Sequence, residues 1–195
     1  MNYPQNFIDA FNHAMIYEVG PWFAPTDLDT IAGKCDTTQQ QRKVGFTDIA
    51  EDRGGVTKFG IAQNMSPDVD VQNITLSDAR AIIYQNYWLL SKCDKIDNKG
   101  VAIMHFDAAI NNGNSASVKM TQQCVGAVVD GIIGQETIAL INQFDAKKLI
   151  TLLADARMQR YNAIIENNPS QKKFFNGWCR RVQEVTQFAL NKCEV

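Results

Sequence analysis

Two carboxyl groups and a hydroxyl in the first third of the chain are of the types that acid–base catalysis needs. Glu18 precedes a predicted helix stop, and Asp52 and Thr57 flank a turn that contains two glycines. A carboxyl group that stays protonated near neutral pH serves as a general acid. Glycines let a ligand approach the backbone closely, because no Cβ is in the way. The pattern predicts that these residues form two walls of one catalytic cleft.

A helix over Asn6–Val19 is predicted to position Glu18. Its apolar residues recur at helical spacing, as Phe7, Phe11, Ala14 and Met15. At ~100° per residue Glu18 falls within their stripe, and Gly20-Pro21 then ends the helix. Apolar surroundings and the negative end of the helix dipole both disfavour the ionised carboxylate, which predicts a raised pKa for Glu18. The alternatives are a Glu18 that bends outward into water and an Asp52–Gly60 segment that is only a tight surface turn.

The composition describes an ordinary globular chain of one domain, or of one domain with a sizeable subdomain. Of its 195 residues 45% are hydrophobic and 21% are charged, a proportion typical of globular proteins with a real core. The net charge of −2 gives no reason to bind nucleic acid or an anionic membrane. Lys147-Lys148, Lys172-Lys173 and Arg180-Arg181 are interpreted as solvated helix faces. No stretch is apolar enough to span a membrane, and the N-terminus lacks the features of a signal peptide.

The cysteines and histidines do not predict a metal site or a cofactor. The five cysteines are widely spaced and form no C-x-x-C pair, which argues against zinc ribbons and redox motifs. Their number fits synthesis in a reducing compartment, with one or two disulfides after export left open. His13 and His105 have no metal-ligating companion one helical turn away and are interpreted as core or surface histidines.

The remaining chain predicts a mostly α fold with a small β or loop region in the N-terminal third. Thr30–Ala32 and Val44–Thr47 are candidates for a small hairpin, and Val56–Ile61 for a strand or bend. Helices are predicted from a capping box at Thr75 through Trp88, and over the apolar segment Val101–Ile110. Four more follow: from a cap at Ser115 to about Val125, from Thr137 to Gln143, from Lys147 to Asn167, and from Phe174 to Asn191.

Six motifs follow one another in a fixed order. They are Glu18-Val19-Gly20 and residues 52–61, 84–88, 106–113, 129–137 and 177–182. In this order they resemble glycoside hydrolase family 108, the phage and bacterial muramidases, with a C-terminal helical region similar to one often described as peptidoglycan-binding. The resemblance implies a lysozyme-like helical fold. It implies a catalytic region over 1–97 and a peptidoglycan-binding-like region over 98–195, packed as one compact unit.

The resemblance implies a muramidase that hydrolyses the β-1,4 bond between N-acetylmuramic acid and N-acetylglucosamine. Glu18 would be the general acid, and Asp52 and Thr57 would orient the attacking water, which favours an inverting course. Tyr84, Tyr87 and Trp88 are candidates for stacking on sugar rings, although aromatic residues on such a helix are often core residues. The remaining substrate-binding candidates, Asp107, Asn111 and Asn112, are polar residues on a predicted buried helix; Asp107 is equally a candidate structural partner.

Two departures from the family pattern leave alternatives open. Val19 replaces the first glycine of Glu-Gly-Gly, and a segment of roughly Asp27–Glu51 is longer than the family pattern predicts. The long segment also makes Asp48 and Glu51 candidates for the second acid, although only Asp52 has the family frame. A lytic transglycosylase that uses Glu18 alone is one alternative activity. A peptidoglycan-binding phage protein without activity is the other.

The resemblance also implies a biological setting. It suggests an antimicrobial phage or prophage endolysin that acts in host cell lysis. Such an enzyme stays in the host bacterial cytoplasm until a holin releases it to the cell wall, which fits the missing signal peptide. The alternative is a bacterial homologue that is exported by another route. The expected partner is the glycan strand of peptidoglycan, with no nucleic acid, no stable membrane association and no second copy of the chain.

Overall fold

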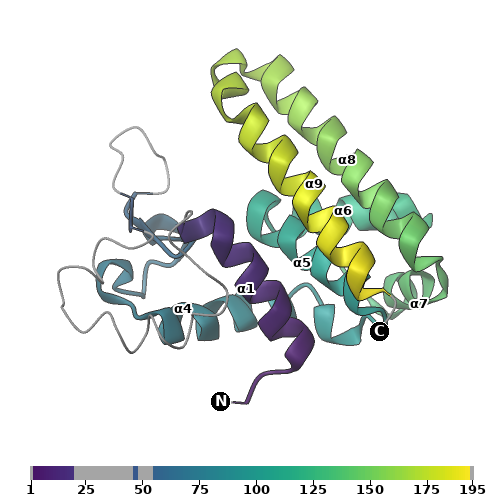
Figure 1. The fold of residues 1–195 in the computed structure, drawn as a ribbon, viewed down its shortest axis with the longest axis horizontal. Helices are drawn as coiled ribbons and strands as arrows, with labels where there is room; N and C mark the ends of the chain where they lie inside the picture. The colour runs from purple at the N-terminus through teal and green to yellow at the C-terminus, as the bar shows by residue number, and fades with distance from the viewer. Residues whose placement is uncertain (1, 20–45, 48–54, 194–195) are drawn as a thin grey trace. The chain divides into compact units, whose positions relative to one another are not determined.

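The computed structural model describes residues 2–19, 46–47 and 55–193, and it is mostly α-helical with one small sheet (Figure 1). This confirms the predicted fold class, including the place of the sheet in the N-terminal third. Two compact units divide the chain. We call Ile8–Gln85 the N-terminal unit, and Met1–Phe7 together with Asn86–Val195 the helical unit.

The N-terminal unit contains the end of the first helix, a three-stranded sheet and short helices. Helix α1 covers Gln5–Val19, close to the predicted bounds, and buries its apolar stripe. The antiparallel sheet has the order β1 (Phe46–Thr47), β2 (Thr57–Lys58) and β3 (Ile61–Ala62). Residues 46–47 of the predicted strand Val44–Thr47 form β1, which pairs with β2. The predicted pairing with Thr30–Ala32 is not tested. Residues 30–32 lie outside the described part of the chain.

Two 3₁₀ turns lead from the sheet to the next helix. They are η2 (Gln63–Met65) and η3 (Val71–Asn73). Helix α4 (Leu76–Ile83) begins with the predicted capping box, in which the Thr75 hydroxyl accepts from the Asp78 N–H and the Asp78 carboxylate accepts from the Thr75 N–H. The chain then continues as a π-helical turn, η4 (Tyr84–Leu89), and a 3₁₀ turn, η5 (Cys93–Lys95). The predicted helix thus has its expected extent but changes its winding at Tyr84.

The helical unit is built around α5 (Lys99–Asn112). Ten consecutive residues of this helix, 100–109, are buried, which confirms the prediction of a central helix without a polar face. Helices α6 (Asn114–Val125), α8 (Ala146–Asn167) and α9 (Phe175–Lys192) pack against it, as Figure 1 shows. Helix α7 (Gln135–Gln143) packs on α6, and η6 (Pro169–Phe174) joins α8 to α9.

The cap of α6 differs from the prediction. Ser115 lies inside the helix, because Asn114 is already helical and Gly113 is the N-cap residue. The first helical hydrogen bond runs from the Ser117 N–H to the Gly113 carbonyl, at 3.0 Å. Gly113 has φ +85°, a conformation in which glycine is favoured over residues that carry a Cβ. The break between α5 and α6 therefore depends on the glycine and not on a serine cap.

Among the described helices, none combines the length and the hydropathy that a bilayer-crossing segment needs.

Candidate functional site

A tight hairpin turn between β2 and β3 is the part of the N-terminal unit that meets Glu18. Lys58 pairs with Ile61, so Phe59 and Gly60 form a two-residue loop, with φ angles of +53° and +78°. Positive φ at both positions is the mark of a type I′ turn, whose twist matches that of the strands. Glycine adopts this conformation freely, whereas Phe59 does so at a cost of about 1–2 kcal/mol. Phe59 is buried, and its packing offsets that strain.

Glu18 lies against the backbone of this turn. An ideal Cβ placed on Gly60 would lie 3.0 Å from both Cγ and Oε2 of Glu18. Glu18 itself is half-buried in the last turn of α1, as the sequence predicts. A glycine is therefore favoured at position 60 for two reasons. The backbone has a positive φ there, and the Glu18 carboxyl group occupies the space that a Cβ would take. The end of α1 and the hairpin turn together position this carboxyl group.

Thr57 lies on the central strand of the same sheet. Its neighbour Lys58 is buried, with Nζ donating to the Gln72 carbonyl at 3.1 Å and lying 5.4 Å from the centre of the Phe59 ring. Adjacent side chains on a strand point to opposite faces, so the inward Lys58 puts Thr57 on the other face. There Thr57 is half-buried and pairs with Ala62. The buried lysine inside this motif is a feature that the sequence analysis missed.

The glycine turn before Thr57 is described only in its second half. Gly55 has φ +68°, and the Thr57 hydroxyl lies 3.5 Å from the Gly55 carbonyl, a long hydrogen bond. The side chain of Asn64 lies beside Gly55, 3.5 Å from the position that a Cβ would take. Asp52, like Asp48 and Glu51, lies outside the described residues.

The three aromatic candidates have different environments. Tyr84 is half-buried in the N-terminal unit, and Tyr87 is half-buried in the helical unit. Trp88 is fully buried and packs edge-on against Phe7 and Phe106, with ring centres 5.5 and 5.4 Å away. Trp88 therefore exposes no face on which a sugar ring can stack, and its place in the structure is that of a core residue. The two tyrosines, in contrast, are partly exposed residues.

Asp107 is a buried ion-pair partner. Arg181 donates to both of its carboxylate oxygens, with its terminal nitrogen at 2.9 Å, and Arg157 donates from 2.8 Å. Asp107 is 2% exposed, so substrate does not reach it. Burial alone would raise the pKa of Asp107, but the charges and hydrogen bonds of Arg181 and Arg157 lower it to about 2. The structure thus corrects the expectation of a substrate contact in favour of a structural role.

The same network corrects one interpretation of the basic clusters and reaches a further predicted residue. Arg181 is 5% exposed, so the pair Arg180-Arg181 is not a solvated face as a whole. Arg157 also donates to the Tyr161 hydroxyl, which in turn donates to the Asn111 side chain. Asn111 is therefore fixed from α8, while its neighbour Asn112 is half-buried and donates to Asn111. All these residues belong to the helical unit, whereas Glu18 and Thr57 belong to the N-terminal unit.

His105 is a core histidine, as the sequence predicts. Its Nδ1 lies 2.8 Å from the Thr121 hydroxyl and 3.2 Å from the Ser117 hydroxyl, and all three residues are buried. Burial lowers the pKa of His105 to about 4, so the ring is neutral at pH 7. Because the neutral ring carries no charge, it needs no counter-ion in this buried position.

Two family matches cover most of the described chain in succession. The family described as Glycosyl hydrolase 108 matches residues 40–113, and the family described as Predicted Peptidoglycan domain matches residues 116–183. The two stretches meet at the break between α5 and α6. Asp52 and Thr57 lie inside the first stretch, and Glu18 lies before it. Helix α5 therefore belongs to the hydrolase stretch by sequence and to the helical unit by packing.

A solved structure has the same fold. The structure of SagA from Brucella abortus is 28% identical to this chain and superposes with a TM-score of 0.68. The match covers 88% of this chain and 98% of that chain. Among the curated proteins none matches this sequence. Residues 40–113 thus match the Glycosyl hydrolase 108 family, and residues 116–183 match the Predicted Peptidoglycan domain. Together with the SagA structure these matches support a glycoside hydrolase that acts on peptidoglycan.

Proposed function

We propose that the protein is a muramidase, which hydrolyses the β-1,4 bond between N-acetylmuramic acid and N-acetylglucosamine. Glu18 protonates the leaving oxygen as the general acid, and Asp52 with Thr57 orients the attacking water. The contact of the Glu18 carboxyl group with the Gly60 turn carries the proposal. Glu18 lies outside the stretch that matches the hydrolase family, whereas Gly60 and Thr57 lie inside it. The contact therefore brings the acid next to the matched motif.

The chemistry requires two groups with different roles. An acid must protonate the glycosidic oxygen, while a second group activates water or stabilises the oxocarbenium-like transition state. Thr57 itself is half-buried and not fully enclosed, which supports access of water to its hydroxyl. A hydroxyl and a carboxylate that hold water favour a single displacement with inversion. Tyr84, Tyr87 and Asn112, which are all partly exposed residues, are our remaining candidates for contacts with the glycan.

The experiment that tests the proposal is the digestion of purified peptidoglycan, followed by mass analysis of the released fragments. A muramidase releases fragments that end in reducing N-acetylmuramic acid. Fragments that end in 1,6-anhydromuramic acid would instead show a lytic transglycosylase, in which the sugar's own hydroxyl attacks. Binding to peptidoglycan without any cleavage would show a binding protein.

Asp52→Asn is expected to lower the hydrolysis rate by about 10²-fold or more, since the water loses its carboxylate partner. The measurement is the initial rate of dye release from labelled peptidoglycan. Asp48→Asn and Glu51→Gln are the matched controls, because they remove a neighbouring charge outside the Asp-x-Gly-Gly-x-Thr frame. A normal rate for Asp52→Asn together with a loss in one control would transfer the role to that residue.

Gly60→Ala is expected to lower the hydrolysis rate by about tenfold or more, because its Cβ would displace the Glu18 carboxyl group. Gly126→Ala is the matched control. Gly126 has a similar φ of +74°, but a Cβ there meets nothing within 4 Å. Both variants carry the backbone strain, and only Gly60→Ala disturbs Glu18. Equal rates for the two variants, measured at a temperature at which both are folded, would contradict the positioning role of Gly60.

A further inference from the structure

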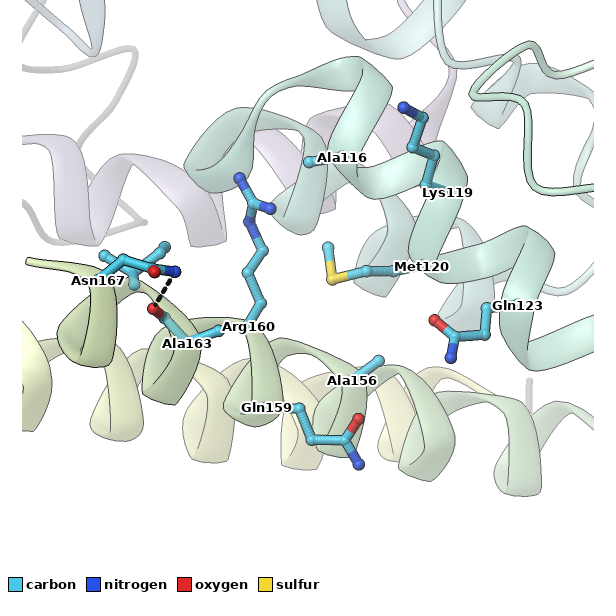
Figure 2. A pocket seen from close by; sticks show the side chains of 10 residues that line it. Ala116, Lys119, Met120, Gln123, Ala156, Gln159, Arg160, Ala163 and Asn167 are labelled. Atoms are coloured by element: carbon cyan, nitrogen blue, oxygen red, sulfur yellow. Dashed lines mark hydrogen bonds between the residues drawn. The ribbon is translucent and has the colours of Figure 1, made fainter.

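A groove between α6 and α8 in the helical unit has the composition of a binding site for an anion. It has a volume of about 410 Å³, within the ~300–1,000 Å³ of typical small-molecule sites. Two cations, Lys119 and Arg160, and three amides, Gln123, Gln159 and Asn167, lie along it (Figure 2). Its lining contains no Asp or Glu and no aromatic residue. All of these residues lie within the stretch that matches the peptidoglycan domain.

Arg160 is the residue of the groove whose charge is best placed to bind an anion. Figure 2 shows it extending from α8 across the groove toward Ala116 of α6. Within the described part of the chain Arg160 makes no hydrogen bond or ion pair. An exposed guanidinium group presents a planar fork of donors that matches a carboxylate in two-point geometry. The guanidinium group of Arg160 can therefore bind a carboxylate in the groove.

Lys119 is partly compensated by a neighbouring charge. It lies near Asp130, whose pKa is lowered by hydrogen bonds from Gln122 and the Ile132 N–H and, to a smaller degree, by Lys119. The carboxylate of Asp130 is thus already held by its own loop. Lys119 adds positive potential to the groove, while Arg160 supplies the specific contact.

The other side chains suit a peptide. The Asn167 amide nitrogen donates to the Ala163 carbonyl at 2.8 Å, which fixes the side chain and leaves its oxygen as an acceptor (Figure 2). From Ala156 to Asn167 the groove follows α8 for about 16 Å, at 1.5 Å per residue. An extended chain of four or five residues has about this length. Peptidoglycan contains short peptide stems with free carboxylates, whereas its sugar rings are commonly recognised by aromatic faces that this groove lacks.

We propose that the α6–α8 groove binds the acidic peptide stem of peptidoglycan, with Arg160 pairing a stem carboxylate. The inference rests on the proposed function for its ligand class, because it makes the groove a second contact with the same polymer. It assigns the groove to the peptide and the Glu18 site to the glycan. The α6–α8 groove would then hold the peptide part of the substrate without taking part in glycan hydrolysis.

The experiment is a titration of the full chain with a synthetic stem tetrapeptide, alanine–γ-glutamate–diaminopimelate–alanine, followed by NMR. The peptide has no glycosidic bond, so its binding does not depend on activity. We expect saturable shifts confined to α6 and α8. Arg160→Ala and Arg160→Gln should each weaken binding by about tenfold, as the loss of a charge-assisted hydrogen bond predicts. Arg160→Lys should lie between these variants and wild type, since it keeps the charge without the fork.

Arg180→Ala is the matched control, because Arg180 is an exposed arginine on α9 outside the groove. Wild-type affinity for Arg160→Ala would overturn the proposal, as would equal binding of a fully amidated peptide. Shifts in α6 and α8 caused by an N-acetylglucosamine tetramer and not by the peptide would also overturn it. Glycan hydrolysis, measured in parallel, separates the two proposals. Intact hydrolysis without peptide binding refutes only the groove, and peptide binding without hydrolysis refutes only the muramidase.

Discussion

Glu18→Gln is expected to lower the rate of peptidoglycan hydrolysis by about 10²- to 10⁴-fold, the usual contribution of a general acid. The amide has the size of the acid but carries no proton that it can transfer to the leaving oxygen. Glu18 is half-buried at a helix end, so the variant should keep the fold. The measurements are the initial rate of dye release from labelled peptidoglycan and the thermal midpoint by circular dichroism.

The matched control for this variant is Glu166→Gln. Glu166 is an exposed residue near the end of α8, and the substitution makes the same chemical change away from the Gly60 turn. The control should retain the wild-type rate. Activity of Glu18→Gln above a few per cent of wild type, with an unchanged thermal midpoint, would exclude Glu18 as the acid.

Asp107→Asn is expected to destabilise the fold by about 3–5 kcal/mol, because it leaves two buried arginines without their counter-ion. The Arg157 side chain is fully buried and that of Arg181 is 7% exposed, so water cannot replace the carboxylate. For a chain of this size such a loss lowers the thermal midpoint by roughly 6–20 °C. Asp155→Asn, an exposed change on α8, is the control and should stay near wild type.

The stabilisation by Asp107 should also depend on pH, and it should be lost in acid. The pKa of Asp107 is lowered to about 2 in the folded protein, from an ordinary value of 3.8. The ion pair therefore stabilises the fold fully above pH ~4 and loses its contribution as the pH falls toward 2. The unfolding free energies of wild type and Asp107→Asn should differ most near neutral pH and converge in acid. A constant difference across this range would show that the charge of Asp107 is not the cause.

The Asp107 network also joins the two family regions into one core. Asp107 and Asn111 lie in the hydrolase stretch, while Arg157, Tyr161 and Arg181 lie in the peptidoglycan-domain stretch. The ion pairs and hydrogen bonds among them connect α5 to α8 and α9. The boundary at residues 97/98 remains a prediction, and the packing boundary at 85/86 places α5 with the later helices.

Local patterns in the sequence predict most of the helices well. The apolar stripe and the Gly20-Pro21 stop define α1 to within one residue, and the Thr75–Asp78 pair forms the expected capping box. The segment Val101–Ile110 has no continuous polar face, and this predicts the burial of α5. These features depend on residues near one another in the chain, where periodicity and capping chemistry decide the structure.

The roles of the buried polar residues depend on distant partners and escape such patterns. Nothing near Asp107 in the sequence shows that Arg157 and Arg181, 50 and 74 residues away, surround it. A signal was nevertheless present, because Arg157 continues the four-residue spacing of Leu149 and Leu153, both buried on α8. An arginine inside an apolar stripe predicts a buried acidic partner, since a lone charge there is costly.

Some of the candidate site was predictable and some required the structure. Glu18 in the last turn of α1 follows from helix periodicity, whereas its contact with Gly60 depends on the type I′ turn at Phe59, a residue that rarely has positive φ. Trp88 was a candidate for sugar stacking because the sequence of its own helix does not show whether the side chain is buried or exposed. Its burial follows from Phe7 and Phe106, which come from two other helices.

Glycan hydrolysis through Glu18 is tested by digestion of peptidoglycan in H₂¹⁸O with wild type and Glu18→Gln side by side. Mass analysis then reports the new chain ends. We expect one ¹⁸O in each new reducing N-acetylmuramic acid with wild type, and no such product from the variant at equal enzyme concentration and time. Anhydro ends without ¹⁸O, or equal amounts of labelled product from both proteins, would contradict it.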